Sequence, residues 1–106
     1  MTRKYQVVTL PPAEADMEAA FQWIYAKAPD KAVEWFENVR EAISSLTAFP
    51  DRCPLAPECA NFKLPIRQLV YGKRSGKYRI LFIVGLGKVH VLHVRHGARL
   101  ILDAES

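Results

Sequence analysis

The chain has 106 residues, of which half are apolar and a quarter are charged, and its formal net charge is +4. This length and composition fit one globular domain spanning residues 1–106, and they exclude a disordered chain and separate cofactor and substrate domains. The longest apolar run, residues 80–84, is far shorter than the roughly 20 residues of a membrane-spanning helix. The N-terminus also has no apolar signal region, so we expect a cytoplasmic protein.

The first predicted elements are a short strand and a helix. Residues 5–9 have a strand-like composition. Pro11 and Pro12 follow, and their fixed φ suits the first turn of a helix. The apolar residues of the predicted helix recur at helical spacing, at Met17, Phe21, Ile24 and Ala28.

A second helix follows a short break at Pro29 and Asp30. Asp30 is a plausible N-cap, because its side chain can accept a hydrogen bond from a free backbone N–H. The second apolar stripe repeats at spacings of four and three, at Ala32, Phe36, Val39, Ile43 and Leu46. The short break predicts an antiparallel helical hairpin whose apolar stripes belong to the core.

The second half of the chain predicts strands. Residues 49–65 contain four of the seven prolines, which indicates an ordered loop or extended arm. Three strand candidates follow, at residues 66–71, 78–84 and 89–94, with turns at 72–76 and 85–88. We expect an α+β fold of order β-α-α-β-β-β, with the helical hairpin packed on one face of a mainly antiparallel sheet.

The cysteines and histidines do not form a convincing metal site. Cys53 and Cys59 are expected to be free thiols in the cytosol. Strand alternation puts His90 and His93 on opposite faces of the sheet. His90 and His96 share a face, but they lie roughly 20 Å apart at 3.3 Å per residue. We therefore expect no metal.

The charges are strongly segregated along the chain. No Asp or Glu occurs from Cys59 to Leu102. The same stretch carries nine cations: Lys63, Arg67, Lys73, Arg74, Lys77, Arg79, Lys88, Arg95 and Arg99. Such a one-sided field attracts polyanions or an acidic partner, although a solvated basic face without a role is the alternative.

Arg79 stands near the start of an otherwise apolar strand. Its guanidinium either reaches out to solvent at the end of the sheet or lies in a concave site, where it binds a phosphate or carboxylate with two hydrogen bonds. Arg67 shares a strand face with Leu69 and Tyr71. Alternation alone does not show whether these arginines converge.

A series of short motifs runs through nearly the whole chain. They are Thr9 before the first helix, the Pro-Asp break, Phe49-Pro50 after the second helix, Ile66-Arg67-Gln68-Leu69, Tyr78-Arg79-Ile80-Leu81, and Val94-Arg95-His96-Gly97-Ala98-Arg99. As an ordered set they resemble the RelE/ParE superfamily of bacterial toxins. The resemblance implies the toxin half of a type II toxin–antitoxin pair. It also implies an antitoxin encoded beside it, whose C-terminal segment wraps this domain and forms a hetero-oligomer with it.

RelE-like members of this superfamily cut mRNA on the ribosome without a metal or another cofactor, by attack of the RNA 2′-OH on the adjacent phosphate. On this interpretation Arg79 stabilises the charge of the phosphorane, Arg67 binds a neighbouring phosphate, and His96 transfers a proton. The expected RNA-binding residues are Lys63, Lys73, Arg74, Lys77, Arg95 and Arg99.

ParE-like members instead bind DNA gyrase and have no catalysis of their own. The absence of a tyrosine after Arg99 favours this alternative, since RelE-like nucleases commonly place one in or after the terminal loop. The four residues Arg67, Arg79, His96 and Arg99 favour the nuclease, so the resemblance leaves both mechanisms open, with a slight preference for the nuclease. A toxin that has decayed to an antitoxin-binding domain is a third alternative.

Overall fold

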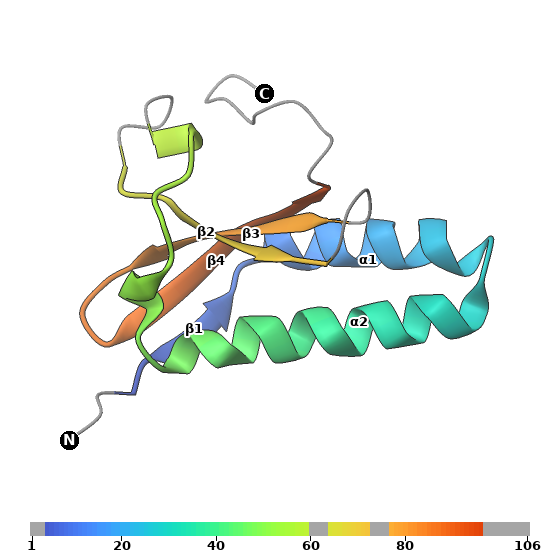
Figure 1. The fold of residues 1–106 in the computed structure, drawn as a ribbon, viewed down its shortest axis with the longest axis horizontal. Helices are drawn as coiled ribbons and strands as arrows, with labels where there is room; N and C mark the ends of the chain where they lie inside the picture. The colour runs from blue at the N-terminus through green and yellow to red at the C-terminus, as the bar shows by residue number, and fades with distance from the viewer. Residues whose placement is uncertain (1–3, 60–63, 73–76, 97–106) are drawn as a thin grey trace.

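The computed structural model describes residues 4–59, 64–72 and 77–96. Strand β1 (Gln6–Thr9) leads into helices α1 (Pro11–Tyr25) and α2 (Pro29–Ser44). Two 3-10 turns, η1 (Ser45–Thr47) and η2 (Pro50–Arg52), precede strands β2 (Arg67–Tyr71), β3 (Tyr78–Val84) and β4 (Lys88–His96) (Figure 1). The predicted order β-α-α-β-β-β is confirmed.

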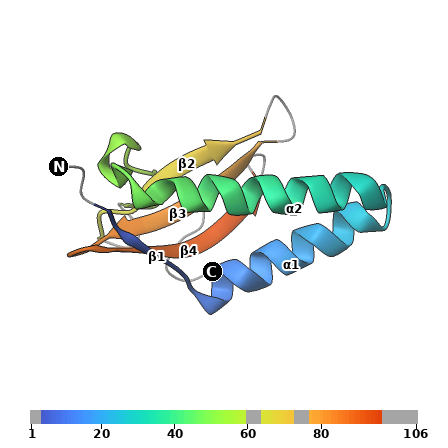
Figure 2. The ribbon, with the colours of Figure 1, turned by 90° about the horizontal axis from the view of Figure 1, so that it is seen from below.

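The four strands form one sheet in the order β1-β4-β3-β2. Strands β2, β3 and β4 make the predicted antiparallel meander, and β1 joins β4 in parallel. Both helices cover the same face of this sheet (Figure 2). We call it the helix face and its reverse the outer face. Within the part of the chain that the structure describes, no helix is long and apolar enough to span a bilayer.

Proline determines where both helices begin. The extended backbone of Leu10 precedes Pro11, and Pro29 likewise takes the first helical position of α2. Proline suits this position because its φ is preset and it lacks the N–H that would have no partner there. The prediction that Asp30 caps α2 was therefore wrong: Ala28 occupies the cap position, and Asp30 lies in the first turn, where its charge complements the helix dipole.

The main core lies between the helices and the helix face of the sheet. Its members include Val39 and Ile43 of α2, which belong to the predicted stripe, and Phe82 of β3. Trp35 is also buried there, although the predicted stripe did not include it. A smaller cluster of Ala56, Ile66 and Leu81 packs on the outer face.

A register shift lies between Leu81 and Phe82 where β3 pairs with β4. His90 pairs with Ile83 and His93 with Leu81, so both histidines share the outer face. His96 pairs with Tyr78 on the helix face. The predicted faces of the three histidines were therefore wrong, because an irregularity that adds one residue to a strand reverses the alternation beyond it.

Candidate functional site

Arg79, the cation singled out in the apolar strand, is held by an ion pair inside the chain. Its Nη1 donates to Oε1 of Glu58 at 2.9 Å, and its Nη2 donates to Oε2 at 2.7 Å. Nη1 also donates to the side-chain oxygen of Gln68 at 3.2 Å. The Arg79 side chain is 12% exposed and that of Glu58 is fully buried. Of the two alternatives for Arg79, the structure shows the one with two hydrogen bonds to an anion, and the anion is a carboxylate of the same chain.

Glu58 lies in the proline-rich arm that crosses the outer face. Backbone bonds attach the arm to the start of β2, since Ala56 N donates to Ile66 O at 2.7 Å and Gln68 N to Pro54 O at 3.0 Å. Sequence reasoning missed Glu58 as a site residue. Its sequence position gave one indication, because it is the last carboxylate before the basic stretch.

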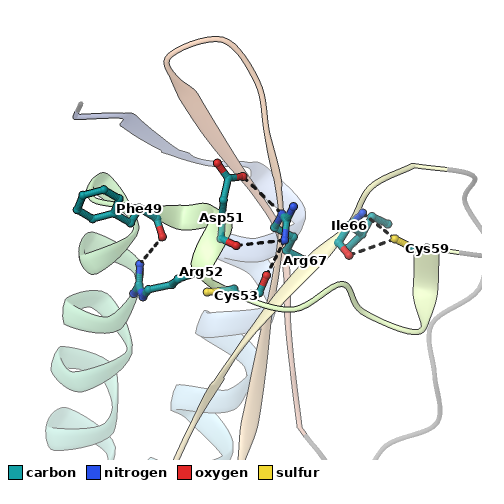
Figure 3. A network of polar contacts seen from close by, with 7 residues as sticks. All are labelled: Phe49, Asp51, Arg52, Cys53, Cys59, Ile66 and Arg67. Carbon is teal, nitrogen blue, oxygen red and sulfur yellow. Dashed lines mark hydrogen bonds and ion pairs between the residues drawn. The ribbon is translucent and has the colours of Figure 1, made fainter. Parts of the chain in front are cut away.

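Arg67 binds a different part of the chain (Figure 3). Its Nη1 donates to the carbonyl oxygens of Cys53 at 2.7 Å and Asp51 at 3.4 Å, and its Nε lies 3.7 Å from a carboxylate oxygen of Asp51. Arg67 pairs with Phe82, so it lies on the helix face, whereas Arg79 lies with Leu81 on the outer face. The sheet thus separates the two arginines.

His96 ends β4 in aromatic surroundings. Its ring meets Tyr78 edge-on with the ring centres 5.1 Å apart, and Tyr78 in turn contacts Trp35 at 5.1 Å. A cavity of about 400 Å³ opens here. Its lining residues are Trp23, Ile24, Lys31, Glu34, Trp35, Asn38, Tyr71, Tyr78 and His96. His96 shares the helix face with Arg67, but it pairs at the opposite end of β3.

The remaining predicted cations are scattered. Arg95 lies 3.9 Å from a carboxylate oxygen of Asp16, and Lys77 is exposed before β3. The predicted residues Lys63, Lys73, Arg74 and Arg99 lie outside the described residues. The structure therefore does not bring Arg67, Arg79 and His96 together into one site.

Both cysteines are free thiols. Cys53 is buried, and burial raises the pKa of its thiol above the usual value despite the opposing charges of Arg52 and Arg67. The Cys59 sulfur accepts the backbone N–H of Ile66 at 3.1 Å. Among the described residues, no cluster of three or more His, Cys, Asp or Glu side chains could hold a metal ion.

Comparisons with known proteins agree with the fold. Residues 7–101 match the family model described as the ParE toxin of the type II toxin–antitoxin system parDE. A solved structure titled "Chromosomal ParDE TA system from P. aeruginosa" superposes with a TM-score of 0.71 at 17% sequence identity, over 89% of this chain and 97% of the other. None of the curated proteins compared with the chain matches it.

Proposed function

Because the chain belongs to the ParE family of toxins from type II toxin–antitoxin systems, we propose that it arrests growth by binding DNA gyrase, without catalysis of its own. The observation that carries this proposal is the internal engagement of the two candidate catalytic arginines. Arg79 is neutralised by Glu58, and Arg67 binds the η2 turn on the opposite face.

A phosphoryl-transfer site needs donors that converge on the place where charge develops. Such donors must also be free when the substrate arrives. Both terminal nitrogens of Arg79 already donate to a fully buried carboxylate, and releasing Arg79 would break this buried ion pair. Binding a protein target requires no such release, so the observed geometry favours it.

The ribosome-dependent endoribonuclease is the second candidate, and the charge distribution favours it. Nine cations and no carboxylate lie between Cys59 and Leu102, which suits a partner made of RNA. On this alternative Arg79 and Arg67 bind the reacting and neighbouring phosphates and His96 transfers the proton, with Lys63, Lys73, Arg74, Lys77, Arg95 and Arg99 contacting RNA. Arg79 would first have to leave Glu58.

The proposal includes a cognate antitoxin, encoded beside the toxin, that binds this chain in a hetero-oligomer and neutralises it. The excess of cations in the second half of the chain fits an antitoxin segment that carries acidic residues. Both candidate targets, gyrase and the ribosome, place the protein in the cytoplasm.

The deciding experiment compares the two targets with one preparation of the purified chain. We expect inhibition of supercoiling by purified bacterial DNA gyrase, with an intact message in primer extension after translation in a reconstituted system. Cuts within codons that require ribosomes and disappear in Arg79→Ala and His96→Gln would favour the nuclease instead. Normal growth on expression of the folded chain alone would indicate a decayed toxin.

A further inference from the structure

Phe49 combines strain with exposure. Its φ is +48°, and it is the one non-glycine residue with positive φ in the part of the chain that the structure describes. This left-handed conformation is costly for a residue with a bulky side chain. Pro50 follows, and the residue before a proline normally adopts an extended conformation. The side chain is nevertheless 64% exposed, so burial of the ring offsets little of this strain.

The segment before Phe49 is attached to the two residues that precede β1. Tyr5 N donates to Thr47 O at 2.8 Å, and Lys4 and Ala48 form an isolated antiparallel bridge. Arg52, which follows Phe49, also binds this segment. Its Nη1 donates to the carbonyl oxygens of Ala48 at 2.7 Å and Phe49 at 3.1 Å, and its backbone N–H also donates to Phe49 O at 3.1 Å.

The segment after Phe49 is attached to β2 by Arg67, which binds the carbonyl oxygens of Asp51 and Cys53. Figure 3 shows the Arg52 bond to Phe49 and the Arg67 bonds to Asp51 and Cys53, with the Phe49 ring turned away from Asp51 and Arg67. A strained residue persists only where its surroundings over-determine its conformation, and such residues cluster at functional sites. The bonds on both sides of Phe49 meet that condition for its backbone, which directs an exposed side chain toward solvent.

We propose that Phe49 is the anchor with which this toxin inserts into an apolar pocket on its target protein. The inference rests on the proposed function as a protein-binding toxin. Large aromatic side chains are typical anchors of protein interfaces, and a side chain carried by a backbone that is already ordered costs less entropy to bind. Among the described residues in and beside the turn, Lys4, Arg52 and Arg67 are cations and Asp51 is a carboxylate, so the pocket on the target should have an acidic rim.

The target is a better match for this side chain than the antitoxin. A single protruding ring needs a preformed concave pocket, which a folded protein supplies. An antitoxin segment that wraps the domain binds by filling grooves, such as the aromatic cavity beside His96. Phe49 belongs to a different part of the fold, after the end of α2.

Two substitutions distinguish the effect of losing the Phe49 ring from the effect of changing its strained backbone. Phe49→Asn removes the ring but suits the left-handed conformation, so it should keep or raise the melting temperature. Phe49→Tyr keeps the ring. We expect Phe49→Asn to weaken binding to immobilised bacterial DNA gyrase by about 30-fold, the loss typical of an interface anchor, and to abolish growth arrest. Phe49→Tyr should retain both, as should Tyr25→Ala, a control that removes a half-exposed aromatic ring from α1.

The outcomes distinguish this inference from the proposed function. Full growth arrest by a folded Phe49→Asn chain would overturn the anchor. Loss of co-purification with the protein encoded by the adjoining gene, with growth arrest intact, would assign Phe49 to the antitoxin and also overturn it. If the wild type arrests growth without touching gyrase and Phe49→Asn does not, the anchor stands and gyrase is the wrong target. A wild-type chain that does not arrest growth would overturn both.

Discussion

Glu58 and Arg79 illustrate how much one tertiary contact changes the chemistry of a residue. The sequence indicated that a guanidinium in an apolar strand needs either solvent or an anion. The anion is Glu58, 21 positions earlier in the chain and fully buried. No local pattern identifies this partner, because the contact exists only once the arm lies across the outer face.

The ion pair should matter for stability mainly because its carboxylate is fully buried, so that removing the arginine is costly. We expect Arg79→Met to lower the free energy of unfolding by about 3–5 kcal/mol, because it removes the guanidinium that donates two hydrogen bonds to the fully buried carboxylate of Glu58. Urea denaturation measures this. Adding Glu58→Gln to Arg79→Met should recover part of the loss.

Arg40→Met is the matched control for this prediction. Arg40 is an exposed arginine of α2 that lies over the Phe36 ring, 5.9 Å from its centre. Its replacement should cost less than about 1 kcal/mol. A cost for Arg79→Met no greater than that for Arg40→Met would show that the buried pair contributes nothing specific.

At the scale of elements, α1 completes the sheet where β1 ends. The pairing of β1 with β4 stops at Val91, and no strand among the described residues pairs with the next part of the β4 edge. Asp16 of α1 fills this position, since one carboxylate oxygen accepts the backbone N–H of Val94 at 3.0 Å and lies 2.9 Å from Nδ1 of His93. The helix thus satisfies a strand donor that would otherwise lack a partner.

We expect Asp16→Ala to destabilise the protein by about 1–3 kcal/mol and to speed hydrogen exchange at the Val94 amide, because that donor loses its acceptor. Thermal unfolding and amide exchange measure the two effects. Glu18→Ala removes an exposed carboxylate of the same helix, which accepts a hydrogen bond from the exposed side chain of Gln22, so it should change stability by under about 0.5 kcal/mol. Unchanged Val94 protection in Asp16→Ala would refute this role.

The types and order of the elements followed from the sequence, but the register of β4 against β3 did not. Helical spacing and the proline positions predicted both helices, and strand composition predicted the meander. The shift opposite Leu81 and Phe82 reversed the predicted face of His93 relative to His90. Such a shift depends on how two strands and a helix fit together, so alternation within one strand cannot reveal it.

At the scale of the whole molecule, apolar packing occurs on both faces of the sheet. The helices cover one face, and the proline-rich arm covers part of the other, where Leu81 is 1% exposed beside Ala56 and Ile66. The arm is therefore a structural layer rather than a simple connection. Its removal from the sheet would expose both the Leu81 cluster and the Glu58 ion pair.

We expect Leu81→Ala to lower the free energy of unfolding by about 2–4 kcal/mol, because it opens a cavity beneath the arm. Unfolding should remain a single cooperative transition. Chemical denaturation measures the cost. Val70→Ala on the same face is the control, since Val70 pairs with Arg79 but is 47% exposed. Its replacement should cost under about 1 kcal/mol, and an equal cost for both variants would mean that the arm does not seal a core.

The sequence by itself determined the elements, their order, the segregation of charge and the family resemblance, because these properties are carried by neighbouring residues and by composition. The tertiary structure alone decided that Glu58 neutralises Arg79, that Arg67 holds the η2 turn, and that Phe49 is strained and exposed. Most of these contacts join distant parts of the chain: Glu58 and Arg79 are 21 residues apart, and Lys4 and Ala48, which form a bridge beside Phe49, are 44 apart. The contact between Asp16 and His93 spans 77 residues. The physical reason is that the partner of a charged or strained group is set by packing between layers, which local periodicity does not record.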